Sequence, residues 1–410
     1  MSAALKIAIV GAGIGGLTAA LALLQRGHDV TVFEQAHEIS ELGAGLQISA
    51  NGTRVLRALG LEEAMGAVIC EAAWKEVRIW SSGTTRKLFD LGTDSRERFG
   101  APYWFVHRGD FHRVLRETVS ALKPNAIFSG ARVTGYEAHE NGVSLHFESG
   151  EPVDSDILIG ADGVHSTLRN QMFESPKAKF SGLVAWRGLI NMDRLPQDLR
   201  RPVGTNWVGP HGHVVTYPLK LGKVLNFVGV VEDAEWRTES WSTTGTREEC
   251  AARFLGWHPN VQAMIDGIDQ PFKWALVGRD PLPQWSLGRV TLLGDACHPT
   301  LPFLAQGANM AIEDAMVLTR CLDHLADDPA RALKRYEELR VDRCTKIVLG
   351  STANAERFHN PVLADPNDAE DYLDREWAPD KVRLRYDWLF EHDVNTMAID
   401  PVAETGARTQ

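Results

Sequence analysis

The 410-residue sequence lacks any uninterrupted apolar run long enough to cross a bilayer. A membrane-spanning helix needs about 20 apolar residues, so we expect no membrane partner. The apolar stretch near the start has no basic region before it, leads into a glycine-rich turn, and is interpreted as a strand instead of a signal peptide. Acidic residues outnumber basic ones, with 54 Asp and Glu against 43 Lys and Arg and a formal net charge of −11. Nucleic acids bind clustered Lys and Arg, so a nucleic-acid partner is not expected either.

Cysteine is rare in the chain as well. Five cysteines are scattered along it, and neither a CxxC pair nor a Cys/His cluster with metal-ligand spacing occurs. The sequence therefore predicts neither a disulfide scaffold nor a metal site, and a reducing cytoplasm is the simplest location. Repeats and low-complexity segments are absent. The apolar fraction of 44% and the charged fraction of 24% are typical of a globular protein, and the length suggests two or three domains.

Glycine, by contrast, is concentrated in the segment "GAGIGG" at residues 11–16. "KIAIV" before it predicts a buried strand, "LTAALALLQRG" after it a helix, and "DVTVFE" a second strand. This order is typical of dinucleotide-binding βαβ units. Gly11 would allow the tight turn, Gly13 the close approach of a pyrophosphate, and Gly16 the packing of helix on strand, with Gly15 completing the motif.

The helix that follows these glycines would hold phosphates with its first N–H groups and its positive end. Glu34, with Gln35 beside it, ends the second strand and is placed to bind ribose hydroxyls. An acid at this position suits both NAD and FAD, so the motif alone leaves the dinucleotide open.

Two later segments also predict a strand, a glycine-containing turn and a helix. "DSDILIGADGVHSTLRNQM" predicts a strand over Asp156–Ile159, a turn with Asp162 and Gly163, and a helix capped by Ser166 or Thr167.

"GRVTLLGDACHPTLPFLAQGANMAIEDAMVLTRCL" predicts a strand over Val290–Leu293, a turn with Gly294 and Asp295, and a long helix. Asp295, at the carboxyl end of a strand, is placed to accept from a ribitol or ribose hydroxyl. The first N–H groups of the helix suit a partial negative charge. They belong to Gly307, Ala308 and Asn309.

With "GAGIGG", "GADGVHSTLR" and "GRVTLLGDACHP" in this order, the chain resembles the single-component FAD-dependent aromatic hydroxylases, which include salicylate, 3-hydroxybenzoate and 6-hydroxynicotinate monooxygenases. The resemblance implies that the first motif holds the ADP part of FAD and the third its phosphate and ribityl chain. The middle motif would serve both FAD and NAD(P)H. Arg108 in "HRGDFHRVL" would reach the FAD from a helix start, whereas without the resemblance it is a solvated helix-terminal charge.

The resemblance also implies an α/β fold like that of p-hydroxybenzoate hydroxylase. A discontinuous Rossmann-like FAD-binding domain would cover residues 1–175 and 275–345. A β-sheet substrate domain would cover 176–274 with part of 70–105, and a C-terminal helical region 346–410. Only one GxGxxG is present, so NADH or NADPH would bind transiently over the FAD without a domain of its own.

The segment between the second and third motifs has a different composition. Short runs rich in Val, Trp, Tyr and Thr, separated by Gly and Pro, predict an antiparallel sheet, which forms one wall of the substrate pocket in the family. In "HGHVVTYPL", His213 and Tyr217 share a strand face ~13 Å apart. Their spacing matches the catalytic or substrate-binding pair of 3-hydroxybenzoate and 6-hydroxynicotinate hydroxylases. His211 competes for this role if the strand extends that far, which Gly212 could prevent.

Three further residues are substrate candidates. Gln47 in "ELGAGLQISANG" borders the isoalloxazine in relatives, and Pro302 and Phe303 enter the loop beneath the flavin ring. The 3-hydroxybenzoate enzymes have a polar amide near Pro302, and its absence here argues against 3-hydroxybenzoate itself. Cys297 is expected to pack beside a strand instead of reacting. The acidic segment 359–374 is expected to be a surface loop.

The resemblance implies an enzyme that hydroxylates a small phenolic or hydroxypyridine carboxylate with NAD(P)H and O2, through a flavin C4a-hydroperoxide. A phenolate is richer in electrons than a phenol, so we assign His213 as the base at the substrate hydroxyl. Tyr217 would hold that hydroxyl or the carboxylate. Two alternatives stay open: a monooxygenase or epoxidase of non-phenolic or polycyclic secondary metabolites, and a non-catalytic FAD-binding regulator. The expected state is a cytoplasmic monomer or homodimer.

Overall fold

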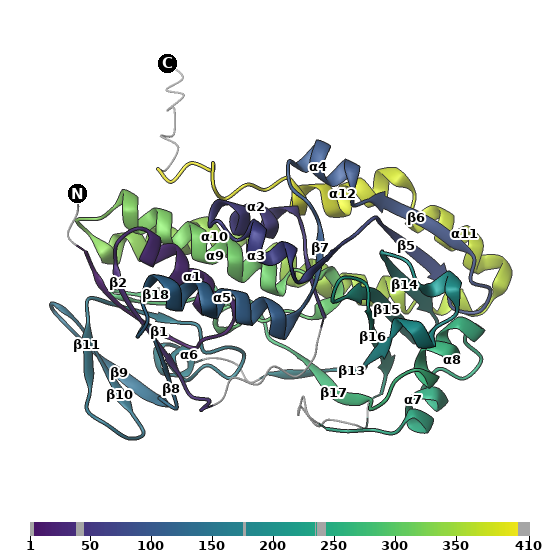
Figure 1. The fold of residues 1–410 in the computed structure, drawn as a ribbon, viewed down its shortest axis with the longest axis horizontal. Coiled ribbons are helices and arrows are strands. Elements are labelled where there is room, and N and C mark those ends of the chain that lie inside the picture. The colour runs from purple at the N-terminus through teal and green to yellow at the C-terminus, as the bar shows by residue number, and fades with distance from the viewer. Residues whose placement is uncertain (1–3, 38–44, 175–177, 234, 236–242, 401–410) are drawn as a thin grey trace, which may run out of the picture.

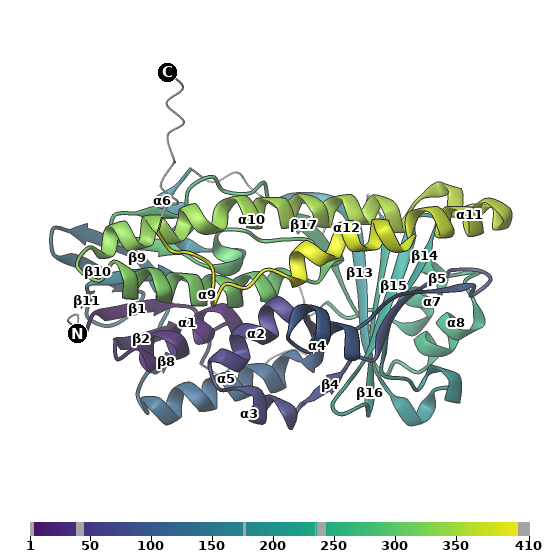
Figure 2. The ribbon, with the colours of Figure 1, turned by 90° about the horizontal axis from the view of Figure 1, so that it is seen from above.

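The computed structural model describes residues 4–37, 45–174, 178–233, 235 and 243–400. Two large sheets lie at opposite ends of an elongated molecule; the helix α10 (Pro329–Phe358) runs along both, and α9 (Gly307–His324) lies beside the first (Figures 1 and 2). The α/β architecture agrees with the predicted fold class. The predicted domain boundary at 175 and 176 falls on residues outside the described part, and the other boundaries stay predictions.

The first sheet has six strands in the order β18-β19-β12-β1-β2-β8. Its central strands β1 (Lys6–Val10), β12 (Ile157–Gly160) and β19 (Val290–Leu292) are parallel neighbours. They consist of β-branched and apolar residues because helices cover both faces of such a sheet. Their bounds lie within one residue of the predicted strands. The turns of all three glycine motifs therefore meet at one edge, where parallel strands have their carboxyl ends.

The other strands of this sheet are β2 (Asp29–Glu34), β8 (Ile127–Ser129) and β18 (Ser286–Leu287). Helix α1 (Ile14–Gln25) packs against α5 (Arg108–Leu122) and α9. Shorter helices complete this half: α2 (Ala50–Ala58), α3 (Glu62–Gly66), α4 (Thr93–Phe99) and α6 (Thr167–Met172).

Two three-stranded sheets lie beside the six-stranded sheet and its helices. One joins β9 (Val133–His139), β10 (Gly142–Phe147) and β11 (Val153–Ser155). The other joins β3 (Gly45–Ile48), β7 (Trp104–His107) and β4 (Ile69–Glu71). The second of these sheets lies next to the large sheet of the other half, because β15 packs against β7 and β4.

The second large sheet has seven strands in the order β17-β13-β16-β15-β14-β5-β6. They are β5 (Trp74–Ile79), β6 (Thr85–Asp90), β13 (Lys179–Asn191), β14 (Val203–Gly209), β15 (Gly212–Leu219), β16 (Val224–Glu232) and β17 (Phe272–Gly278). The prediction of an antiparallel sheet between the second and third motifs is confirmed, since β13, β14, β15, β16 and β17 pair antiparallel. The strand β5, from outside that segment, adds to it in parallel with β14. The strand β5 comes from a distant part of the chain, so no hairpin constrains its direction.

One face of the seven-stranded sheet packs against α7 (Arg247–Arg253) and α8 (Pro259–Asp266), around a small core that includes Trp186, Trp207 and Phe254. The other face turns toward the six-stranded half and belongs to the main core. Side chains of alternate residues point to alternate faces, so each strand contributes to both.

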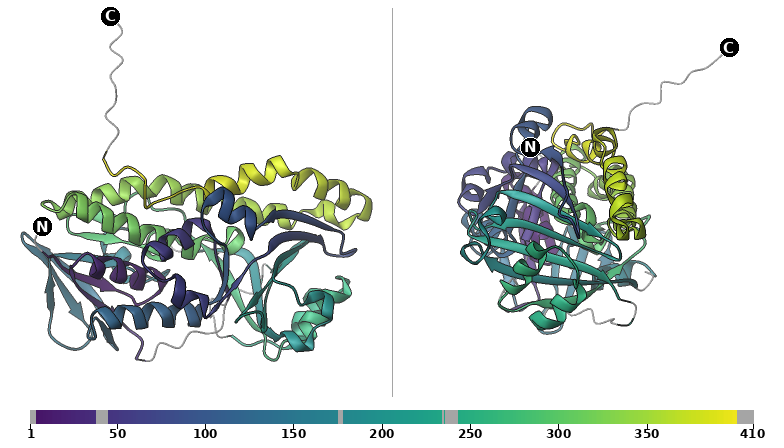
Figure 3. Two further views of the ribbon diagram at one scale, coloured as in Figure 1. Left: turned by 45° about the horizontal axis from the view of Figure 1, so that its top comes forward. Right: turned by 90° about the vertical axis from the view of Figure 1, so that its right-hand side faces the viewer.

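The C-terminal part is helical, as predicted, and lies along one side of both sheets (Figure 3). The expected surface loop at 359–374 is wrong, because α11 (Pro366–Glu376) begins there, with Asp365 accepting from the N–H of Asn367 at 2.9 Å. Proline at the first helical position favours this start, as it does in α12 (Pro379–Phe390). Within the described ranges, no helix combines the length and apolarity that crossing a membrane requires.

Candidate active site

The glycine turn after β1 has two positions that only glycine can occupy and one that is open. A Cβ on Gly11, where φ is 104°, would lie 2.3 Å from the carbonyl oxygen of Ala161. A Cβ on Gly16 would lie 2.0 Å from the carbonyl oxygen of Gly11. Around Gly13, in contrast, nothing lies within 4 Å of the Cβ position. The first two glycines serve packing, and Gly13 leaves space for a ligand beside the uncapped N–H groups that begin α1.

Glu34 is held against this turn. Its Oε2 accepts from the N–H of Ala12 at 2.8 Å, and its Oε1 from the N–H of Ala36 at 2.9 Å. Each carboxylate oxygen has a second lone pair, so Glu34 can still accept from a ribose hydroxyl. Gln35 next to it is exposed.

Asp295 follows β19 in a 3-10 turn over Gly294–Ala296. Desolvation by the surrounding protein raises the pKa of its carboxyl, while His298 and Arg108 act in the opposite direction. The residue is exposed. Arg108, from the start of α5, is thus brought within electrostatic reach of Asp295 across a separation of nearly half the chain.

The middle motif forms the turn between β12 and the start of α6. Ser166 caps this helix, with its Oγ accepting from the N–H of Arg169 at 2.9 Å, as one of the two predicted caps. The carboxylate of Asp162 accepts from the N–H of Thr167 at 2.7 Å and fixes the same turn. Gly163, with φ of 77°, has the left-handed conformation that favours glycine.

The start of α9 has no side-chain cap, so the predicted N–H donors at Gly307, Ala308 and Asn309 are not used by a capping side chain. The side chain of Asn309 forms hydrogen bonds to the main chain of a neighbouring segment. It donates to the carbonyl oxygen of Gln47 at 3.0 Å and accepts from the N–H of Ser49 at 3.0 Å, which fastens β3 to α9.

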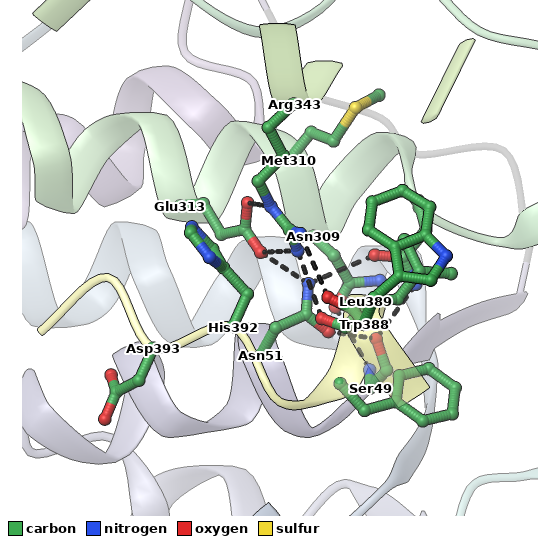
Figure 4. A network of polar contacts seen from close by, with 12 residues as sticks. Ser49, Asn51, Asn309, Met310, Glu313, Arg343, Trp388, Leu389, His392 and Asp393 are labelled. Atoms are coloured by element: carbon green, nitrogen blue, oxygen red, sulfur yellow. Dashed lines mark hydrogen bonds and ion pairs between the residues drawn. The ribbon is translucent and has the colours of Figure 1, made fainter. Parts of the chain in front are cut away.

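A buried polar network that the sequence analysis missed holds this corner together (Figure 4). Glu313 of α9 accepts from Asn51 of α2 at 2.6 Å and from two nitrogens of Arg343 at 2.8 and 2.9 Å. Arg343 also donates to the carbonyl oxygens of Trp388 and Leu389. Burial raises the pKa of Glu313, but the neighbouring arginines lower it by more. The pKa of Glu313 therefore lies below its ordinary value. The network joins α2, α9, α10 and α12 beneath the uncapped start of α9.

The strand registers gather polar side chains on the inner face of the seven-stranded sheet. His213 lies opposite Val208, and Val208 lies opposite Ile79. Residues at even spacing along one strand share a face, so Lys75 lies on the same face as Ile79, and Tyr217 on the same face as His213. Buried residues of this face that carry polar atoms are Lys75, Arg187, Asn206, His213, Tyr217 and Asn226.

His213 is 2% exposed and lies among aromatic rings. Its ring centroid is 5.3 Å from that of Phe303 and 5.1 Å from that of Phe358. Its Nδ1 lies 2.6 Å from Nε2 of His359. Desolvation, followed by the neighbouring His359, lowers the pKa of His213 well below its ordinary value. The structure thus brings two predicted residues together, His213 and Phe303, whereas Pro302 is exposed beside them.

Tyr217 stacks on Phe105 of β7, with ring centroids 5.1 Å apart. A Cβ on Gly45 would lie 2.5 Å from the Tyr217 ring, so the glycine admits the tyrosine at this point. Burial raises the pKa of Tyr217. The phenol therefore remains a hydrogen-bond donor near neutral pH.

Gln47 joins this face to β3 and β7. Its Oε1 accepts from the hydroxyl of Tyr103 at 2.8 Å and from Nζ of Lys75 at 3.3 Å. Lys75 is 7% exposed, and burial alone lowers its pKa to about 8. No carboxylate of the described residues lies within ion-pair distance of it. The sequence analysis missed Lys75, because a lysine inside a run such as "WKEVRI" is usually solvated and its burial becomes visible only in the fold.

His211 does not join this group. The strand β15 begins at Gly212, and His211 precedes it with φ of 62°. Its exposed ring lies 2.8 Å from Glu232 through Nδ1 and Oε2. The alternation that would place it beside His213 is broken by this turn.

Among the described residues, one group of side chains has ligand atoms close enough together for a metal ion: Cys297, His298 and Asp314. All three are buried, and most of their ligand atoms already have partners, although Nδ1 of His298 has none in the described part of the chain. Asp314 accepts from His298 at 2.6 Å and from Arg340 at 2.8 Å. Burial raises the pKa of Cys297 to about 12. A fixed guanidinium and a protonated thiol make this a structural ion-paired cluster.

Comparison with known proteins identifies relatives over most of the chain. A family model described as an FAD binding domain matches residues 4–351. The chain is 41% identical over 356 residues to 3-amino-4-hydroxybenzoate 2-monooxygenase PtmB3 of Streptomyces platensis, covering 87% of this chain and 89% of that protein. It is 39% identical over 355 residues to 6-hydroxynicotinate 3-monooxygenase of Pseudomonas fluorescens, covering 85% and 90%.

Solved structures of similar proteins share the fold of this chain. The Klebsiella pneumoniae protein HpxO, complexed with FAD and uric acid, is similar with a TM-score of 0.79 and 30% identity, covering 93% of this chain and 97% of that one. A substrate complex of salicylate hydroxylase is similar with a TM-score of 0.79 and 27% identity, covering 96% of both chains.

Proposed function

The chain belongs to the FAD-dependent aromatic-ring monooxygenases, and from this premise we propose that it hydroxylates a small phenolic or hydroxypyridine carboxylate, using NAD(P)H and O2. Relatives of this kind are enzymes, so a purely regulatory FAD-binding protein is no longer an alternative. The observation that carries the choice of substrate is the inner sheet face, which combines a neutral buried imidazole with a buried ammonium that has no acid partner among the described residues.

The residues at the sheet edge fit FAD. Gly13 and the start of α1 offer an open, positively polarised surface for a pyrophosphate, and Glu34 retains lone pairs for a ribose. Asp295 presents an exposed carboxylate to a ribityl hydroxyl, with Arg108 near it. Bound FAD supplies the redox chemistry, which is the transfer of electrons from NAD(P)H to O2. The protein supplies binding, orientation, exclusion of water and movement of the substrate proton.

His213 is proposed to take the proton of the substrate hydroxyl. Its Nδ1 is engaged by His359, so Nε2 is the nitrogen left for the substrate. Because its pKa is lowered, the ring is neutral near pH 7 and able to accept a proton. Positioned proton transfer of this kind contributes roughly 10²–10⁴-fold to a rate. Phe303 and Phe358 exclude water from one side of the ring.

Lys75 is proposed to bind the carboxylate of the substrate. An ammonium that is desolvated without a counter-charge is unfavourable, and an incoming carboxylate relieves that cost. β14 lies between β5 and β15, so two strand spacings of ~4.8 Å separate Lys75 and Tyr217 by about 10 Å across the sheet. A single aromatic ring can therefore contact both, with Tyr217 donating to its hydroxyl or carboxylate.

The experiment is a panel of hydroxybenzoates and hydroxynicotinates, each paired with its methyl ester. Substrate-stimulated oxidation of NADH and of NADPH by the holoenzyme is measured, and the products are identified by mass spectrometry. We expect at least one free acid to be hydroxylated in preference to its ester. Stimulation by esters and polycyclic phenols alone, with none by any acid, would contradict the proposal and favour the polycyclic alternative.

A cytoplasmic monomer or homodimer remains a prediction. Light scattering of the purified holoenzyme measures its mass, and fractionation of cells measures its location.

A further inference from the structure

His213 belongs to a line of titratable groups that leads from the interior to the surface. Its Nδ1 lies 2.6 Å from Nε2 of His359, which ends α10. Nδ1 of His359 lies 3.7 Å from Oε1 of Glu232 at the end of β16, and Oε2 of Glu232 lies 2.8 Å from His211. These contacts join three segments that are distant in the sequence.

The exposure of these side chains rises steadily along the line. His213 is 2% exposed and His359 4%, whereas the side chain of Glu232 is 48% exposed and that of His211 64%. Glu232 is therefore the first member of the line that meets solvent. His213 itself has no such access, because Phe303 and Phe358 lie beside it.

The main chain fixes this arrangement. The carbonyl oxygen of His359 accepts from the N–H of His211 at 3.3 Å, and the N–H of Glu232 donates to the carbonyl oxygen of His211 at 3.0 Å. His211, just before β15, thus links the main chain of His359 to that of Glu232 at the end of β16. The ring of His359 is thus held with one nitrogen toward the base and the other toward an exposed carboxylate.

We propose that His359 and Glu232 form the route by which the proton of the substrate hydroxyl leaves the active site. The inference rests on the proposed role of His213. The substrate O–H bond breaks and an N–H bond forms at Nε2 of His213, while the proton on its Nδ1 passes to Nε2 of His359. The proton on Nδ1 of His359 passes to Glu232 and from there to water. One proton leaves, the phenolate keeps the electron pair, and no group is oxidised or reduced.

The chemistry of the two rings favours this route over storage of the proton. A neutral imidazole has one donor and one acceptor nitrogen, so two rings in contact can pass a proton without turning. Burial lowers the pKa of His213 and brings that of His359 to about 4, despite the opposing effect of Glu232. An imidazolium at either position is therefore short-lived. The gap of 3.7 Å is too long for a direct hydrogen bond, and the half-exposed Glu232 closes it by rotation or through a water.

Few other charges face the line. The titratable groups that contact His359 are His213, Glu232 and, by its charge, His211. Arg253 of α7 donates to the carbonyl oxygen of Glu232 at 3.1 Å and not to its carboxylate. Oε2 of Glu232 pairs with His211, and Oε1 faces His359, from which it can accept a proton.

The test is the release of a proton when the holoenzyme binds a phenolic acid that it hydroxylates. Stopped-flow mixing in weak buffer with a pH indicator dye follows the proton, and the flavin absorbance follows binding of the substrate. His359→Gln retains a polar side chain but cannot relay, and Glu232→Gln changes only an exposed group. Glu338→Gln, an exposed glutamate of α10 paired with Arg335, is the matched control.

We expect wild type and the control to release one proton with the flavin change, and both route variants to release it at least tenfold more slowly. Glu232→Ala should regain speed when formate is added, which a merely structural role would not produce. Release at the wild-type rate in Glu232→Gln and His359→Gln would overturn the route. If wild type itself releases no proton, the proposed role of His213 fails instead, so the two failures are distinguishable.

Discussion

Replacement of Lys75 by methionine tests the proposed substrate site most sharply, because it changes a charge while keeping most of the volume. A hydrogen bond to a charged group contributes about 1.5–3 kcal/mol. Its loss should raise the KM for the preferred acid roughly 10- to 100-fold, at 1.4 kcal/mol for each factor of ten. The methyl ester of the same acid has no charge for Lys75 to bind, so its KM should change less than threefold.

The same variant should gain stability. Burial lowers the pKa of Lys75 from 10.5 to about 8, which corresponds to roughly 3 kcal/mol at 1.36 kcal/mol for each pH unit. Below pH 8 both folded and unfolded chains carry the proton, so the folded wild type bears this cost in full. Between pH 8 and 10.5 the unfolded chain binds more protons than the folded one, so wild-type stability should rise with pH. Lys75→Met should begin higher and lack this rise.

The assay compares initial rates of NAD(P)H oxidation with acid and ester, and the thermal midpoint at pH 7 and pH 9.5. Lys87→Met is the matched control, because Lys87 lies on the neighbouring strand β6 in an exposed ion pair with Asp90. An unchanged KM for the acid would refute the reasoning, as would equal losses for acid and ester.

Three other predictions concern the base, the glycine turn and the buried network. His213→Gln should accept electrons from NAD(P)H at the wild-type rate but lose hydroxylation about 10²–10⁴-fold, measured as product formed for each NAD(P)H consumed. Gly13→Val should fold, because its Cβ position is open, but lose FAD, whereas Gly16→Ala should lower the thermal midpoint of the apoprotein. Glu313→Gln removes the charge that faces Arg343 and the fully buried Arg340 and should destabilise the protein by about 3–5 kcal/mol in denaturant titrations.

Each of these predictions has an outcome that contradicts it. Wild-type coupling in His213→Gln would remove the histidine from the mechanism. A yellow Gly13→Val protein with full flavin content would show that no phosphate approaches that glycine. If Glu313→Gln unfolds at the wild-type denaturant concentration, the network contributes nothing to stability.

The part of the fold that depends on local signals could be predicted from the sequence. Each glycine motif carries its own strand, turn and helix, so the bounds of β12 and β19 were predicted within one residue. The meeting of the three turns follows from the parallel order of β1, β12 and β19. In contrast, no residue pattern near β5 predicts that this strand pairs in parallel with β14.

The residues of the site likewise differ in whether their position follows from the local sequence or from contacts between distant segments. Alternation along β15 places His213 and Tyr217 on one face, and this needs no knowledge of other strands. Lys75 becomes a binding candidate only when the fold buries it, because an isolated lysine in a β-rich run is usually solvated. His359 was hidden because its segment resembles an acidic loop, and its contact with His213 spans 146 positions.

The most direct test of the whole account is a crystal structure of the FAD-loaded enzyme with a hydroxylated aromatic acid bound. We expect the carboxylate about 2.7–2.9 Å from Nζ of Lys75, the length of a charge-assisted hydrogen bond. We also expect the ring hydroxyl within hydrogen-bond distance of Nε2 of His213. A ring seated with its carboxylate in solvent, or with its hydroxyl remote from His213, would contradict it.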